Sequence, residues 1–225
     1  MEFKQREKEV FRILEKLRDL DIVLIGGYAL NSYVEFPRFS VDCDLMAYDG
    51  KEAVEILKRE EYNLIEDRKD FIRLEKKVDS LKVGMDILIK ELIDRQSGVT
   101  FEFSDILRNS AIRELPSKSE PKLRIKFRIA SPEVLFVLKF ASMRDQDIRD
   151  IFMLSTLDLD KSKIKELVKK YFSNELLENR IKKLKESIDS KSFRDSLQGV
   201  YGKLPEEFIV KNKKRLLSIV QRTIL

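Results

Sequence analysis

Ile22-Val23-Leu24-Ile25-Gly26-Gly27 is a short apolar strand closed by two glycines, and Asp42-Cys43-Asp44-Leu45 follows on a second strand. Side chains of a strand alternate between its faces, so Asp42 and Asp44 point the same way, about 6.6 Å apart along the chain. Two carboxylates about 4–5 Å apart would repel each other by roughly 3–4 kcal/mol at an effective dielectric of about 20. The pattern therefore predicts a cation held between them.

A third aspartate lies on another alternating strand, Lys82-Val83-Gly84-Met85-Asp86-Ile87-Leu88-Ile89. Its apolar residues share one face, which leaves Asp86 on the opposite face. Taken singly, a Gly-Gly pair is most often a turn, and an isolated aspartate is most often a surface residue. Glycines that admit phosphates, followed in order by strand carboxylates that can hold a divalent metal, together favour nucleotide chemistry.

The composition excludes several catalytic classes. The chain has 225 residues, no histidine and one cysteine, Cys43. A Ser-His-Asp or Cys-His centre, a His-ligated zinc and an intramolecular disulfide are therefore excluded. Any metal site must be rich in oxygen, which suits Mg²⁺ or Mn²⁺. Cys43 points away from the aspartates and is expected in the core.

The sequence contains no apolar run long enough to span a bilayer and begins with a charged stretch, so we expect a cytoplasmic protein without a membrane partner. Abundant Lys and Glu with few Asn, Gln and Cys is typical of a thermophile. From Lys161 to Leu225 there are 17 Lys and Arg against 8 Asp and Glu. This basic region suits RNA as a partner, although solvated helix faces explain it equally simply.

Hydrophobic periodicity predicts an α+β fold with a mixed β-sheet flanked by helices and an all-helical C-terminal lobe. We place the boundary near residue 130, with a catalytic core over residues 1–130 and a helical domain over residues 131–225. The expected helices cover residues 2–20, 27–34, 51–60 and 131–143, and further helices run from there to residue 225 with breaks near 158–160, 173, 190 and 199–205. The expected strands cover residues 22–25, 42–47, 62–65, 71–74, 81–89 and 123–129, with short elements and loops over 91–121.

Three segments of the chain resemble the DNA polymerase beta nucleotidyltransferase superfamily, and are most similar to the AbiEii-type abortive-infection nucleotidyltransferase toxins. The first joins Gly26-Gly27-Tyr28-Ala29-Leu30 to Arg38-Phe39-Ser40-Val41-Asp42-Cys43-Asp44-Leu45. The second is Val83-Gly84-Met85-Asp86-Ile87-Leu88, and the third runs from Ser131-Pro132-Glu133 through Lys139 to Asp150. Together they span about residues 22–154.

The resemblance implies transfer of a nucleoside monophosphate from a nucleoside triphosphate (NTP) to an acceptor hydroxyl. Catalysis and metal binding would fall to Asp42, Asp44 and Asp86, with Mg²⁺ or Mn²⁺ bridging the triphosphate. Nucleotide binding would fall to Gly26, Gly27, Arg38, Ser40 and Lys139. Many superfamily members have Gly-Ser at the glycine pair, so here Ser40 or the backbone must replace that hydroxyl.

Lys139 lies in an otherwise apolar helix, where it either extends along the helix to water or reaches the triphosphate as the resemblance implies. Arg144, Asp147 and Asp150 are possible accessory residues. Asp147 and Asp150 share a helix face and resemble the Lys-Asp-x-x-Asp segment of the family, with Gln146 at the lysine position. Arg144 and Arg149 could instead pair with the two aspartates in a structural ion-pair network.

The acceptor implied by the resemblance is an RNA such as tRNA, or a protein side chain, and a cognate antitoxin is an implied partner. Two other functions compete with this one. The first is modification of a small molecule, as in the aminoglycoside nucleotidyltransferases. The second is a non-catalytic nucleotide-binding protein on the same fold, which the presence of all three aspartates argues against.

Overall fold

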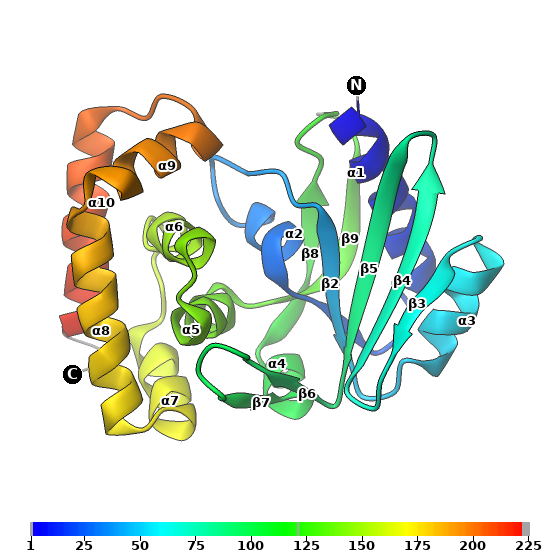
Figure 1. Ribbon diagram of the computed structural model, residues 1–225, viewed down its shortest axis with the longest axis horizontal. Helices are drawn as coiled ribbons and strands as arrows, with labels where there is room; N and C mark the ends of the chain where they lie inside the picture. The colour runs from blue at the N-terminus through cyan, green and yellow to red at the C-terminus, as the bar shows by residue number, and fades with distance from the viewer. Residues whose placement is uncertain (1, 121, 222–225) are drawn as a thin grey trace. The chain divides into compact units, whose positions relative to one another are not determined.

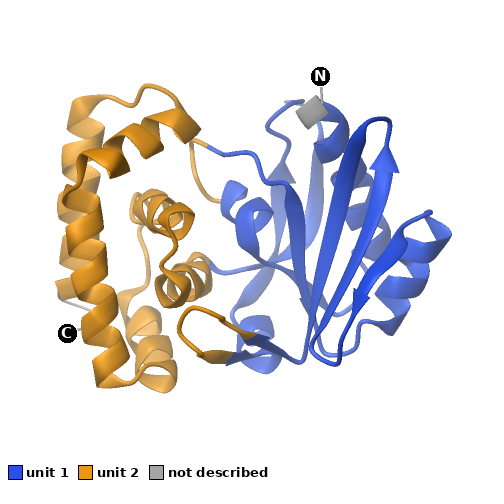
Figure 2. Cartoon of the chain, viewed as in Figure 1, with its two compact units in different colours: residues 1–32, 37–92, 101–131 blue, residues 33–36, 93–100, 132–225 orange. Residues whose placement is uncertain are grey.

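The computed structural model describes residues 2–120 and 122–221, which fold as two compact units (Figures 1 and 2). The first unit, the sheet unit, contains residues 1–32, 37–92 and 101–131. The second, the helical unit, contains residues 33–36, 93–100 and 132–225. The predicted domain boundary near residue 130 stays a prediction, but the main change of unit along the chain, after Ser131, falls beside it.

A seven-stranded mixed sheet forms the sheet unit, in agreement with the predicted α+β fold. Its strands are β1 (Ile22–Leu24), β2 (Asp42–Ala47), β3 (Asn63–Asp67), β4 (Phe71–Val78), β5 (Leu81–Ile89), β8 (Ser110–Pro116) and β9 (Arg124–Ala130). The strand order is β3-β4-β5-β2-β1-β9-β8. β2 is parallel to β5, and β1 is parallel to β9, whereas the remaining neighbours are antiparallel. The strands β6 (Glu91–Ile93) and β7 (Thr100–Glu102) form a separate pair.

Strand alternation explains which face of this sheet is buried. On β5, the side chains of Val83, Met85 and Ile87 are fully buried, while Asp86 between them is only half-buried. The long helix α1 (Glu2–Leu17) packs against β5 and β9 through apolar residues at helical spacing, such as Phe11 and Leu14. The polar face of β5 is therefore left for the carboxylates.

Three shorter helices complete the sheet unit: α2 (Gly26–Asn31), α3 (Lys51–Arg59) and α4 (Phe103–Arg108). α2 follows β1 directly and contacts β2 and β8, and α3 contacts α1 (Figure 1). Because only Ile25 separates β1 from α2, Gly26 and Gly27 begin the helix at the edge where β2 begins.

Six helices make up most of the helical unit. They are α5 (Pro132–Ser142), α6 (Asp145–Leu154), α7 (Lys161–Tyr171), α8 (Asn174–Asp189), α9 (Lys191–Tyr201) and α10 (Glu206–Ile219). Side chains of Asp160, Ser173 and Ser190 accept hydrogen bonds from backbone N–H groups in the first turns of α7, α8 and α9. These caps explain why the helices break where the sequence predicted.

Differences from the predicted elements are local. The expected helix over 2–20 ends at Leu17, and the strand over 110–116 was expected only as short elements and loops. By contrast, the helix expected over 131–143 does end at that place, where Met143 has a left-handed φ of 52° and separates α5 from α6. Residues 222–225 of the predicted C-terminal helix lie outside the described part. Within residues 2–120 and 122–221, no helix is both long and apolar enough to cross a bilayer.

Candidate active site

Strand register places three charged residues side by side on the polar face of the sheet. Asp44 on β2 pairs in register with Asp86 on β5, and Asp86 pairs in register with Arg73 on β4. Residues in register on neighbouring strands project to the same face, and Asp42 joins them because it lies two residues before Asp44. The structure thus brings together the three aspartates that were predicted from two separate strands.

Arg73 is a component of this site that the sequence analysis missed. Its Nη2 lies 3.0 Å from Asp42 Oδ1, and its Nη1 lies 3.4 Å from Asp86 Oδ2. A third ion pair joins Arg73 Nε to Glu75 Oε1 at 3.0 Å. A guanidinium of the chain itself therefore bridges Asp42 and Asp86, while a cation between Asp42 and Asp44 stays a prediction. Arg73 lies on a strand that was predicted, but its partners are distant in sequence, and only the register of β4 on β5 identifies them.

Asp86 is the most perturbed carboxylate of the group. Burial raises the pKa of Asp86 to about 7, Arg73 opposes the rise, and the negative charges of Asp44 and Asp42 add to it. Its Oδ1 atom is buried and has no hydrogen-bond partner among residues 2–120 and 122–221. A carboxylate oxygen with these properties is suited to accept a ligand, either a proton or a metal ion.

Two glycines create the space in which the carboxylates lie. Gly26 has a φ of 68°, and a Cβ atom there would overlap the carboxylate of Asp44. A Cβ atom on Gly84 would lie 2.7 Å from Asp42 Oδ1 and 3.2 Å from Arg73 Nη2. Both positions therefore require glycine for steric reasons, and at Gly26 the left-handed backbone requires it as well.

The predicted phosphate-binding residues Gly27, Arg38 and Ser40 also lie together. A Cβ atom on Gly27 would overlap Ser40 Oγ and lie 3.2 Å from Arg38 Nη1. Asn31 at the end of α2 fixes the backbone of Arg38: its Nδ2 donates to Arg38 O at 2.7 Å, and its Oδ1 accepts from Arg38 N at 3.0 Å. The Ser40 hydroxyl donates to the backbone oxygen of Asp42 at 3.2 Å, which couples this segment to the carboxylates.

The residues present fit a hard divalent cation. All three candidate ligands are carboxylates, the type that Mg²⁺ and Mn²⁺ prefer, and one buried oxygen of Asp86 lacks a partner in the described part of the chain. As the side chains stand, no three acidic or cysteine residues in that part are close enough to form a metal cluster. Arg73 contacts both Asp42 and Asp86 in this arrangement.

The remaining predicted residues form a cluster of their own within the helical unit. Lys139 Nζ lies 2.9 Å from Asp147 Oδ1 and 3.1 Å from Asp150 Oδ2. Arg144 Nε contacts Asp147 Oδ2 at 2.6 Å, and Tyr201, which the sequence analysis missed, donates to Asp150 Oδ1 at 3.3 Å. Both aspartates are fully buried, and the expected pairing of Arg144 with Asp147 is present. Arg149 instead donates to Ser196 Oγ, and Lys139 occupies the place beside the acids that was expected for Arg149. A role for Lys139 toward a triphosphate stays a prediction.

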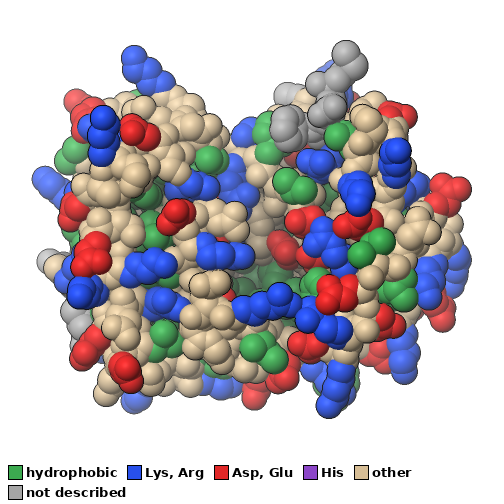
Figure 3. All heavy atoms as spheres, in the orientation of Figure 1, with side chains coloured by type: hydrophobic (Ala, Val, Ile, Leu, Met, Phe, Trp, Pro, Cys, Tyr) green, Lys and Arg blue, Asp and Glu red, His purple; other side chains and the backbone are tan. Residues whose placement is uncertain are grey.

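Basic residues of the C-terminal helices are interspersed with acidic ones. Arg194 pairs with Glu206, and Lys213 pairs with Asp189. On the face seen in Figure 3, blue and red side chains alternate over these helices without forming a continuous basic patch. This arrangement agrees with solvated helix faces, and RNA binding by this region stays a prediction.

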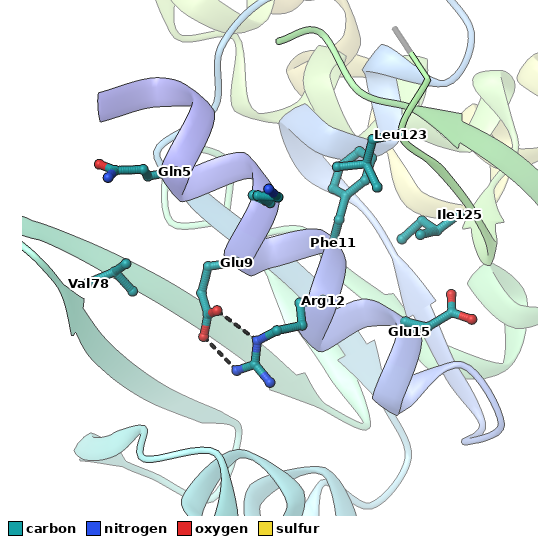
Figure 4. A pocket seen from close by; sticks show the side chains of 9 residues that line it. Gln5, Glu9, Phe11, Arg12, Glu15, Val78, Leu123 and Ile125 are labelled. Carbon is teal, nitrogen blue, oxygen red and sulfur yellow. Dashed lines mark hydrogen bonds and ion pairs between the residues drawn. The ribbon is translucent and has the colours of Figure 1, made fainter. Parts of the chain in front are cut away.

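A separate hollow of about 500 Å³ lies against α1 (Figure 4). Its apolar lining includes Phe11, Val78, Leu123 and Ile125, and the Glu9–Arg12 ion pair lies at its rim. None of the predicted site residues is among the described residues that line it. We therefore place the candidate active site on the carboxylate face of the sheet instead.

A mixed sheet that carries three convergent carboxylates beside a glycine pair is the arrangement of a nucleotidyltransferase, and the comparisons agree. The profile of the family described as "Nucleotidyl transferase AbiEii toxin, Type IV TA system" matches residues 10–216. The chain belongs to this family of nucleotidyltransferases, as its motifs predicted.

Two solved structures from Helicobacter pylori share the fold. One is a protein assigned to the nucleotidyltransferases, with 15% identity, a TM-score of 0.55, and coverage of 99% of this chain and 94% of that chain. The other is JHP933, with 16% identity, a TM-score of 0.55, and coverage of 99% and 91%. No curated protein sequence matches this chain significantly.

Proposed function

We propose that this nucleotidyltransferase moves a nucleoside monophosphate from a metal-bound NTP to an acceptor hydroxyl. The observation that carries the proposal is the convergence of Asp42, Asp44 and Asp86 on one face of neighbouring strands, with a buried Asp86 oxygen that lacks a partner in the described part of the chain. In the transfer, the acceptor oxygen bonds to the α-phosphorus, and the bond from the α-phosphorus to the bridging oxygen of the β-phosphate breaks. Pyrophosphate leaves with that oxygen.

Each carboxylate has a distinct part in the proposed reaction. Asp42 and Asp44 would hold the metal, with Mg²⁺ or Mn²⁺ as the ion. Asp86 would complete the site and accept the proton of the acceptor hydroxyl. The bound metal would supply charge neutralisation at the phosphates and a lower pKa for the acceptor hydroxyl.

The phosphate end of the nucleotide is assigned to the segment around Gly26 and Gly27. Without side chains, these residues let the backbone approach the phosphates, and Arg38 adds a positive charge beside them. Ser40 either donates to a phosphate or keeps its bond to the backbone of Asp42. Lys139 is proposed as a further triphosphate contact, held in position by Asp147, Asp150 and Arg144.

The family matched by the chain is a toxin family of type IV toxin–antitoxin systems. We therefore propose an RNA such as tRNA, or a protein, as the acceptor, and a cognate antitoxin as a partner. The sequence feature that favours RNA is the excess of Lys and Arg after residue 160.

Incorporation of label from each of the four α-³²P NTPs tests the function. The acceptors would be bulk tRNA, an aminoglycoside panel and the protein alone, each with Mg²⁺ or with EDTA. We expect metal-dependent label on tRNA or protein, and none with Asp44→Ala. Label on the aminoglycosides alone would identify a small-molecule enzyme instead. NTP binding without label above the Asp44→Ala level would identify a non-catalytic nucleotide-binding protein.

A further inference from the structure

We propose that Lys118, in the loop between β8 and β9, is a second cation that binds the polyphosphate of the nucleotide beside Arg38. This inference rests on the proposed function in that it takes an NTP as the ligand. Lys118 lies 91 residues after Gly27 and carries no motif, so only the folded chain relates the two. The geometry, the charge and the fixed position of the loop each support the assignment.

The loop that carries Lys118 is fixed by a buried carboxylate. Glu7 on α1 is only 4% exposed, and its Oε1 accepts from Lys118 N at 2.8 Å. Its Oε2 accepts from Ser117 Oγ at 2.6 Å and from Ser119 N at 2.9 Å. Charge-assisted hydrogen bonds of this kind are strong, and here they hold three successive residues. The backbone of Lys118 is thus positioned in advance of any ligand.

The side chain of Lys118 extends to the segment of Arg38 and Ser40. Its Nζ lies 4.6 Å from the centre of the Phe39 ring, a cation–π contact. Phe39 stands between Arg38 and Ser40 in sequence, the two residues that lie against Gly27. The ammonium group is therefore placed beside the residues already assigned to the phosphates.

Lys118 is partly buried, with the carboxylate of Glu7 and the guanidinium of Arg38 as its charged neighbours. Burial lowers the pKa of Lys118, attraction by Glu7 opposes this, and the like charge of Arg38 lowers it further. Among the side chains that the structure describes, none of the carboxylates forms an ion pair with Lys118 Nζ, and the carboxylate oxygens of Glu7 accept hydrogen bonds from the loop. Burial and the nearby guanidinium of Arg38 both disfavour the charged form of Lys118, and a bound polyanion would favour it. A polyphosphate supplies several negative charges at that place.

Binding of sodium tripolyphosphate and of ATP to the full chain, measured by calorimetry in EDTA at low ionic strength, tests the proposal. The variants are Lys118→Ala, Lys118→Arg, and Lys126→Ala as a matched control from an exposed position on β9. We expect Lys118→Ala to weaken both ligands about tenfold. Lys118→Arg and Lys126→Ala should bind like the wild type. Thermal melts should show that Lys118→Ala remains folded.

Equal affinity of Lys118→Ala and wild type for tripolyphosphate would overturn the proposal, as would equal losses in Lys118→Ala and Lys126→Ala. A single-stranded RNA oligonucleotide forms a second arm. If Lys118→Ala weakened only the RNA, the residue would serve the acceptor and the proposal would be wrong. Tripolyphosphate binding needs no transfer step, so a protein that binds it through Lys118 but incorporates no label would disprove the proposed function alone.

Discussion

The two charged clusters of this protein use the same kinds of side chain in opposite environments. In the sheet unit, Asp42 keeps 36% of its side chain exposed and shares Arg73 with Asp86. In the helical unit, Asp147 and Asp150 have no exposed side-chain surface and share Lys139. Carboxylates that remain accessible can exchange a protein cation for a ligand, whereas fully buried ones are committed to their partners. Asp42 and Asp86 can therefore act on a ligand directly, whereas Asp147 and Asp150 can act only by holding Lys139 in position.

The largest effect expected from this contrast is on transfer activity. Asp44→Asn should lower the rate of label incorporation by at least about 1,000-fold, or about 4 kcal/mol in activation free energy. The melting temperature should stay the same or rise, because one negative charge leaves a group of three. Asp67→Asn on β3, an exposed position, is the control and should keep full activity. An active Asp44→Asn enzyme would remove the catalytic role from this cluster.

A substitution in the buried cluster of Lys139, Asp147 and Asp150 should lower the stability of the protein. Asp147→Asn removes a carboxylate that pairs with the buried Lys139 and the half-exposed Arg144, so we expect a loss of about 3 kcal/mol in the free energy of unfolding, mainly from Lys139. Urea denaturation measures it, with Asp145→Asn in the same helix turn as an exposed control. A loss below about 0.5 kcal/mol would show that the cluster does not support the fold.

Substituting alanine for each of two glycines separates the effect of steric overlap at the site from the effect of backbone strain alone. Gly26→Ala combines a left-handed φ with overlap on Asp44, and should cost about 2 kcal/mol or more of stability together with most of the activity. Gly98→Ala has a similar φ of 74° but open space around the new Cβ atom. Gly98→Ala should therefore show only the smaller backbone cost and normal activity. Equal effects of the two would mean that Asp44 adapts to the methyl group.

The cluster of Asp42, Asp44, Asp86 and Arg73 should also make the free energy of unfolding of the metal-free protein depend on pH. The pKa of Asp86 is raised by burial from 3.8 in the unfolded chain to about 7 in the fold, so the native state retains a proton that the unfolded state loses. Its contribution to stability is full below about pH 4 and falls as pH rises toward 7, by at most about 1.4 kcal/mol per pH unit. In urea titrations with EDTA, Asp86→Asn should therefore gain stability over wild type as pH rises. If the difference in unfolding free energy between Asp86→Asn and wild type stayed constant over this pH range, the raised pKa of Asp86 would be contradicted.

The smallest effect concerns Arg73. Arg73→Gln leaves Asp42 and Asp86 without their guanidinium, so the metal-free protein should lose about 1 kcal/mol of stability. Mn²⁺ should bind several-fold more tightly, as measured by electron paramagnetic resonance, because no protein cation competes for the carboxylates. Arg73→Lys keeps the charge, so its stability and its affinity for Mn²⁺ should lie between those of the wild type and Arg73→Gln. Weaker Mn²⁺ binding in Arg73→Gln would mean that Arg73 orients the ligands and does not compete with the metal.

The elements that were predicted correctly from the sequence are those defined by residues close to one another in the chain. The bounds of β2 and β5 were predicted correctly because both strands alternate and carry an aspartate on the polar face. The caps at Ser173 and Ser190 likewise marked helix breaks. These features depend on residues close to one another in the chain, where periodicity is informative.

The missed features depend on contacts between distant segments. β8 was not predicted as one strand because it is an edge strand with mostly exposed side chains, so it lacks clear alternation. Arg73 and Lys118 became site residues only when the strand register and the Glu7 loop were known. The pairing of Lys139 with both Asp147 and Asp150 required α5 and α6 to fold back on each other at Met143, a residue without a sequence signal for a turn.

Cys43 lies between two site aspartates yet is fully buried, and burial holds the pKa of its thiol well above the usual value. Because thiol reagents attack the thiolate, this cysteine should be inert to them in the folded protein. It is the only cysteine in the chain. Every cysteine introduced on the surface would therefore be labelled alone, so that fluorophores or spin probes could track the two units during turnover without first removing a native thiol.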